Sequence, residues 1–159
     1  MKDRKSNETQ IDEVNARLLA ELHADPRITM SELARRVGMS SPAVTERIQR
    51  MRETGVITGF RMDVSPAALG LPVTAFVRIR PAAGRLDRLA ELIRSTAQVS
   101  ECHRITGEDC FLLKMHAANV EGLESVLNRF LAYGQTVSSI VVSTPVPPRH
   151  LPLPANDNP

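Results

Sequence analysis

The sequence contains few aromatic residues: its 159 residues include no tryptophan, one tyrosine and four phenylalanines. Proteins that bind single-stranded nucleic acid stack the bases on aromatic rings, so the composition argues against this class. No apolar run approaches the ~18 residues that a membrane span requires, and residues 1–10 lack the apolar stretch of a signal peptide. We therefore expect a cytoplasmic protein with no membrane partner, in which Cys102 and Cys110 are reduced thiols.

The charge is small in total but unevenly distributed. The net charge is +2, yet residues 27–61 contain seven arginines and three glutamates, a net of +4. Residues 1–26 carry a net of −2, and the remaining residues balance at nine positive and nine negative. A basic stretch of this kind is typical either of a nucleic-acid contact or of an arginine-rich helix surface.

Apolar residues at helical spacing predict three helices before residue 55. For the first helix, either Thr9 or Asp12 is the candidate cap, and the helix ends at Asp25. The second begins with a capping box, in which Thr29 and Glu32 are expected to satisfy each other's backbone amides, and it ends at Gly38.

The third helix is predicted over residues 40–54, with Ser40 or Ser41 as its cap and Pro42 in its first turn. Its buried stripe consists of Val44, Ile48 and Met51. Residues 56–61 then predict a short strand, which makes the module a winged-type helix-turn-helix.

Two short helices joined by a glycine turn indicate DNA binding, with the second helix in the major groove. The alternative is a plain three-helix bundle, which the caps, the glycine turn and the local +4 disfavour. The DNA-binding candidates on the third helix are Ser40, Ser41, Thr45, Gln49 and Arg50. The candidates for phosphate contacts or for helix support are Arg35, Arg36, Arg47, Arg52 and Arg61.

The second half of the chain predicts the element order βαββαβ. The strands are expected over residues 73–80, 99–106, 111–117 and 137–144, with helices around residues 86–93 and 123–130. This order is that of a ferredoxin-like (ACT-like) antiparallel sheet with two helices on one face, so the fold class is α+β. The other sheet face is expected to be covered by a second copy in a homodimer.

These patterns divide the chain into four segments. A DNA-binding domain (1–62) is followed by a linker (63–72), a domain for dimerisation (73–146) and a proline-rich tail (147–159). Because proline cannot extend a ladder, the tail is either an extended arm or a disordered end.

The chain resembles the Lrp/AsnC (feast/famine) transcriptional regulators over almost its full length. The matching stretches are Ile11–Val14 with Leu18 and Leu19, Ser31–Gly38, Arg47–Arg50, Gly55–Phe60, Glu101–His103, Thr106–Gly107 and Leu112–Lys114. The resemblance implies a homo-oligomeric regulator, often octameric, that binds a partly palindromic DNA duplex. It also implies a small effector, usually an amino acid, bound between dimers near the glycine turn.

One departure from the family affects the effector site. Members commonly carry an aspartate three residues after this glycine, where this chain has Cys110. The carboxylates of Glu108 and Asp109 are the alternative partners for the α-amino group of an effector. The backbone amides of the loop at Gly107 could bind the effector's carboxylate. An ordinary hairpin turn is the competing interpretation. The full set of effector-binding candidates is Gly107, Glu108, Asp109, Cys110, Thr136, Ser138 and Ser139.

Other functions are disfavoured. Cys102, His103, Cys110 and His116 fit no zinc spacing, so no metal or other cofactor is expected, and the thiols are expected to be buried. No grouping of catalytic residues stands out. Two alternatives to a DNA-binding regulator stay open: a siroheme-decarboxylase-like enzyme of the same architecture, and a sensor that acts only through protein partners.

Overall fold

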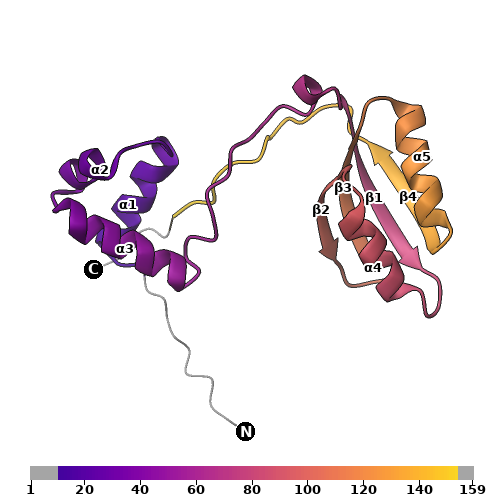
Figure 1. The fold of residues 1–159 in the computed structure, drawn as a ribbon, viewed down its shortest axis with the longest axis horizontal. Coiled ribbons are helices and arrows are strands. Elements are labelled where there is room, and N and C mark those ends of the chain that lie inside the picture. The colour runs from indigo at the N-terminus through magenta and orange to yellow at the C-terminus, as the bar shows by residue number, and fades with distance from the viewer. Residues whose placement is uncertain (1–10, 154–159) are drawn as a thin grey trace, which may run out of the picture. The chain divides into compact units, whose positions relative to one another are not determined.

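Three helices form the amino-terminal part of the protein in this computed structural model, which describes residues 11–153 (Figure 1). They are α1 (Glu13–Ala24), α2 (Met30–Val37) and α3 (Ser41–Glu53). Asp12 caps α1 by accepting a hydrogen bond from the Asn15 backbone N–H at 2.7 Å, and Ser40 caps α3 in the same way through Ala43. These contacts decide both open cap assignments among the described residues; Thr9 lies outside that range.

The cap of α2 forms only in part. The Thr29 hydroxyl accepts from the Glu32 N–H at 3.2 Å, as predicted. The second bond of the capping box, from the Thr29 N–H to the Glu32 carboxylate, was wrongly predicted. Within residues 11–153 this carboxylate instead accepts hydrogen bonds from Arg35 and Arg36. A charge-assisted bond to a guanidinium is stronger than one to a neutral amide, which explains the preference.

The helices bury one apolar cluster. The predicted stripe of α3 is buried together with Ile28 and Leu33, which flank the α2 cap as a hydrophobic staple. The buried members are Leu18, Leu19, Leu22, Ile28, Leu33, Ala34, Val37, Val44, Ile48 and Met51.

The short strand predicted over residues 56–61 is wrong: these residues form no strand. The Ile57 N–H donates to the Met51 carbonyl at 3.0 Å, so the segment begins with the turn that closes the end of α3. An apolar run becomes a strand only when a second strand pairs with it, and no strand is present among the described residues of the first unit.

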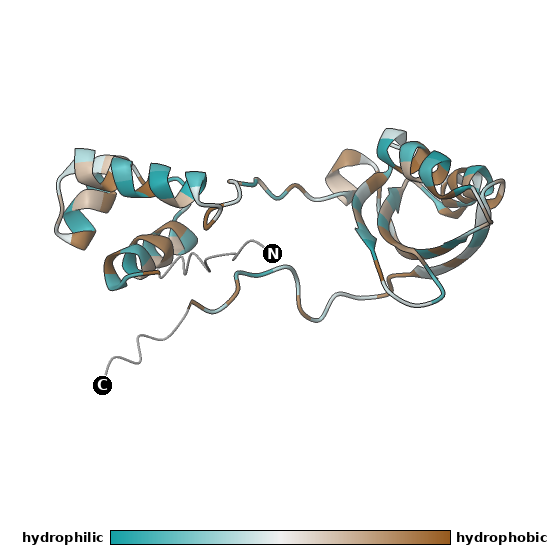
Figure 2. Cartoon of the chain, turned by 90° about the horizontal axis from the view of Figure 1, so that it is seen from below, coloured by the Kyte–Doolittle hydropathy of each residue, from teal (hydrophilic) through white to brown (hydrophobic). Residues whose placement is uncertain are grey.

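The second unit has the predicted order βαββαβ, after a short 3₁₀ turn, η1 (Ala67–Leu69). Its elements are β1 (Val73–Pro81), α4 (Leu86–Ser95), β2 (Val99–Arg104), β3 (Phe111–Ala117), α5 (Val120–Leu131) and β4 (Gly134–Ile140). The strands form one antiparallel sheet in the order β2-β3-β1-β4. Both helices cover the same face of this curved sheet (Figure 2).

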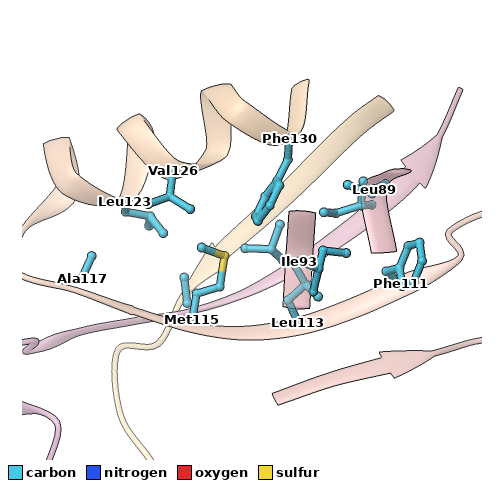
Figure 3. Packing of buried hydrophobic residues seen from close by; sticks show 12 residues of the cluster. Leu89, Ile93, Phe111, Leu113, Met115, Ala117, Leu123, Val126 and Phe130 are labelled. Carbon is cyan, nitrogen blue, oxygen red and sulfur yellow. The ribbon is translucent and has the colours of Figure 1, made fainter. Parts of the chain in front are cut away.

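The core of the second unit lies between the sheet and these two helices. Leu123, Val126 and Phe130 of α5 point toward Leu113 and Met115 on β3 (Figure 3). Every second residue of β3 is buried, which confirms a sheet with one covered face.

Strand β4 is shifted relative to the prediction of residues 137–144. It begins at Gly134 and ends at Ile140, and it pairs along β1 from Pro81 to Ala75. Gly134 lies so close to β1 that a Cβ at this position would overlap the Arg80 carbonyl oxygen. The glycine therefore permits the pairing, although in sequence it is typical of a turn.

The chain divides into two compact units between Met62 and Asp63, and the described residues 148–153 group with the first unit. None of the described helices is long and apolar enough to cross a membrane.

Candidate nucleic-acid interface and effector loop

The turn between α2 and α3 sets the orientation of α3 within the first unit. Gly38 adopts a left-handed conformation, with φ of 73°, and the Met39 N–H bonds to the Ala34 carbonyl at 2.9 Å. A residue with a Cβ is strained in this conformation, so glycine suits the turn. Because α3 buries Val44 and Ile48, its opposite side is exposed.

The exposed side of α3 carries most of the predicted DNA-binding residues. Thr45, Gln49, Arg50 and Arg52 are exposed, and Ser41 is half-buried. The Thr45 hydroxyl donates to the Ser41 carbonyl at 2.9 Å, and the Gln49 amide donates to Glu53 at 2.9 Å. The guanidinium groups of Arg50 and Arg52 form no ion pair with any residue in the described range, so both remain available for a ligand.

Three other predicted arginines form ion pairs within the first unit. Arg36 bridges α1 and α2 through Glu21 at 2.8 Å and Glu32 at 2.9 Å. Arg35 also binds Glu32, at 2.6 Å. The ion pairs of Arg36 link α1 to α2, whereas the pair of Arg35 lies within α2.

Arg47 links α3 to the start of α1. Its guanidinium donates to the Asp12 carboxylate at 2.7 Å and to the Asn15 side chain at 3.1 Å. Burial raises the pKa of Asp12, but the hydrogen bonds from Arg47 and Asn15 outweigh that effect and leave the pKa below its usual value. Spacing along the sequence could not reveal this pair, because 35 residues separate its members.

In the second unit, the loop that joins β2 to β3 meets two arginines of β1. Gly107 has a φ of 106°, which favours glycine. Asp109 lies 3.5 Å from Arg78 and 4.0 Å from Arg80, and Glu108 pairs with Arg80. The two carboxylates proposed to receive an effector's amino group are therefore neutralised in this structure.

The remaining effector candidates are spread along the sheet. Cys110 is half-buried, and its N–H donates to the Ile79 carbonyl at 3.0 Å. Thr136 pairs with Ile79, at the same end of the sheet as the loop. Ser138 and Ser139 lie opposite Val77 and Phe76, farther along the strand. The structure brings together the loop and the end of β1, but not the two serines.

Arg78 and Arg80 lie on one face of β1, because side chains two residues apart in a strand share a face. The pairing of β3 with β1 brings the loop carboxylates to these arginines. The prediction that the thiols are buried is wrong for Cys102, which is exposed.

Histidines on the same strands are engaged in hydrogen bonds. His116 lies 3.1 Å from the Thr74 hydroxyl and 3.0 Å from the Ser100 hydroxyl, and burial lowers its pKa. Within residues 11–153 no group of three or more His, Cys, Asp or Glu side chains could hold a metal ion.

Comparison with known proteins defines the class of protein first. The family described as "Winged helix-turn-helix DNA-binding" matches residues 11–58, and the "Lrp/AsnC ligand binding domain" matches residues 74–151. A helix-turn-helix reader joined to a ligand-binding sheet domain is the organisation of a ligand-responsive transcriptional regulator.

Individual relatives identify the family. The transcriptional regulator LrpC of Bacillus subtilis is 31% identical over 134 residues, which cover 84% of this chain and 93% of that protein. The proline dehydrogenase transcriptional activator of Rhodobacter capsulatus is 36% identical over 77% of this chain and 81% of its own length. The chain belongs to the Lrp/AsnC family of transcriptional regulators, and it is a regulator rather than an enzyme.

A solved structure supports the same assignment. A feast or famine regulatory protein from M. tuberculosis, complexed with L-methionine, is 32% identical and superposes with a TM-score of 0.81. The match covers 89% of this chain and 98% of that one.

The Glu32 cluster generates a test of the α2 contacts. The hydrogen bonds from Arg35 and Arg36 lower the pKa of Glu32 from 4.5 to about 2. The folded state therefore binds fewer protons than the unfolded state, so this contribution to stability is present above pH ~4.5 and is lost as the pH falls toward ~2. Carboxyl-carbon NMR titration should find the low pKa in the wild type and a value nearer 4.5 in the Arg35→Gln/Arg36→Gln variant. Arg52→Gln is the matched control and should leave Glu32 unchanged.

Proposed function

We propose that this regulator binds a specific, partly palindromic DNA duplex through α3 and that a small effector, an amino acid, modulates the binding. The observation that carries the proposal is the exposed side of α3, where Arg50 has no ion-pair partner among the described residues. On this proposal residues 1–62 read DNA, residues 63–72 link the domains, residues 73–146 bind the effector and dimerise, and residues 147–159 form the tail. The protein works beside the DNA it reads, in the cytoplasm.

The chemistry of α3 suits the major groove. Arginine reads guanine through two hydrogen bonds, glutamine reads adenine, and small hydroxyls adapt to either. Arg50, Gln49 and Thr45 supply these groups, with Ser40 and Ser41 at the helix start. Arg52 is the phosphate contact that we favour, because Arg35, Arg36 and Arg47 bind carboxylates of the first unit and Arg52 forms no ion pair in the described range. Arg61 stays a candidate for a phosphate contact.

Arg50→Ala tests the reading of bases by α3. If Arg50 contacts a base edge, the substitution should weaken operator binding by roughly 1–3 kcal/mol and relax specificity at one position. Fluorescence anisotropy at constant salt measures both effects, with a scrambled duplex for comparison.

Arg88→Ala is the control for this measurement, because Arg88 is an exposed arginine of the second unit. Unchanged operator affinity in Arg50→Ala would contradict the assignment of Arg50. No duplex binding by the wild type, even at low salt, would instead favour a sensor that acts through protein partners.

Two relatives support an amino-acid effector. One is complexed with L-methionine, and another is named for activating proline dehydrogenase. An α-amino acid presents one cation and one anion, which the loop can match with Asp109 or Glu108 and with Arg78, Arg80 or the loop amides. The effector then competes with the existing ion pairs of Asp109.

Asp109→Ala should abolish the effector response while basal DNA binding is retained, because the substitution removes a carboxylate far from α3 in the sequence. Isothermal titration calorimetry with candidate amino acids, methionine and proline first, measures effector affinity directly. Asp87→Ala is the matched control on α4. Equal effector affinity in wild type and Asp109→Ala would refute the role of Asp109.

The sheet face opposite the helices supports homo-oligomer formation. Phe76 and Val137 project from neighbouring strands on this face and are 43% and 49% exposed. A second copy would remove their apolar surface from water. We propose a homodimer through this face, which assembles further to an octamer.

Phe76→Arg should dissociate the dimer, because the new charge would be buried beside Lys114, its neighbour on β3. Sedimentation velocity should then show a monomer at protein concentrations where the wild type is dimeric or larger. Leu131→Arg is the control, since Leu131 is 52% exposed on α5 at the other side of the sheet. A wild-type assembly state in Phe76→Arg would contradict this interface.

A further inference from the structure

The chain returns to the first unit after its last strand. From Pro148 onward the described residues group with the helix-turn-helix unit. The His150 ring stacks on the His23 ring of α1, with centroids 4.0 Å apart and planes inclined by 7°. Leu153 packs against the apolar cluster that the three helices bury. Two side chains from one short segment therefore contact the same unit.

His150 also lines a cavity of about 230 Å³ on the first unit. The other lining residues come from the second half of α1 and from the segment that follows α3: Leu19, Leu22, His23, Pro26, Val56, Ile57, Thr58, Gly59, Phe60 and Arg61. Most of these side chains are apolar, and Phe60 is 58% exposed. The titratable or charged members are His23, Arg61 and His150, so no described carboxylate lines the cavity.

We propose that residues 149–153 form a C-terminal clasp, which docks on the DNA-binding unit beside α1 and residues 56–61 and which protonation of His23 releases. The effector domain and the DNA-binding unit are then joined by two chain segments, one at residues 62–63 and one at residues 147–148. Residues 141–148 connect β4 to the clasp, so the clasp provides a second covalent route between the effector domain and the DNA-binding unit.

The composition of the segment suits a clasp. Pro145, Pro147, Pro148 and Pro152 restrict the chain to extended conformations, so less conformational entropy is lost when it docks. Proline also prevents the segment from extending the sheet beyond β4. The segment is therefore free to bind elsewhere through His150 and Leu153.

The sign of the pH dependence follows from the surroundings of His23. Burial first, and then the charge of His150, lowers the pKa of His23 below its usual value of about 6.5. The docked state binds fewer protons than the undocked state. Docking is thus at full strength above pH ~6.5 and weakens as the pH falls below it.

NMR titration of the full-length protein tests the clasp. The chain has four histidines, so their ring C–H signals can be assigned from single His→Gln variants. In wild type the pKa of His23 should lie below its usual value, and His150→Gln should raise it, because the neighbouring charge is removed. Leu153→Asp, which removes the apolar anchor, should raise it in the same direction. His103→Gln, in the second unit, is the control and should have no effect on His23.

Hydrogen exchange provides a second measurement that does not depend on titration. The amide of Asp25 bonds to the Glu21 carbonyl at the end of α1, close to His23. In Leu153→Asp this amide should exchange roughly three-fold faster or more, and the wild type should approach the same rate near pH 5 after correction for intrinsic exchange. Identical His23 pKa values in wild type, His150→Gln and Leu153→Asp would overturn the proposal, as would unchanged exchange in Leu153→Asp.

Discussion

Strand β1 is the constraint on which the second unit depends, because its side chains alternate between two environments. Ala75, Val77 and Ile79 are completely buried beneath α4 and α5. Arg78 and Arg80 lie on the opposite face, where they meet the carboxylates of the β2–β3 loop. A shift of one residue in the register would exchange the two sets. The same alternation therefore determines the core and the electrostatics of the proposed effector loop.

Five of the seven arginines in residues 27–61 fall into two groups. Arg35, Arg36 and Arg47 bind carboxylates of the first unit, and the pairs of Arg36 and Arg47 link different helices. Arg50 and Arg52 lie on the exposed side of α3 without an ion pair in the described range. Arg50 and Arg52 therefore offer uncompensated positive charge on α3 to a phosphate backbone. A regional charge count locates the module but does not separate these roles.

Local signals predicted much of the fold because their physical causes are local. Caps and a left-handed glycine stop or start a helix through bonds within four or five residues, so α2 and α3 were predicted almost to the residue. Strand β4 was misplaced, because its start at Gly134 depends on a close approach to Arg80, 54 positions earlier in the chain. Residues 56–61 were wrongly predicted as a strand, since a strand requires a partner as well as an apolar pattern.

The sequence by itself determined the boundaries of α2 and α3, the βαββαβ order, the family and the residues that α3 exposes, because periodicity and capping act over a few residues. The tertiary structure alone decided which arginine neutralises which carboxylate, that Glu32 binds guanidinium groups instead of completing its capping box, and that His150 reaches His23. These contacts depend on side chains that folding brings together or makes compete for one partner, and no local pattern encodes the outcome.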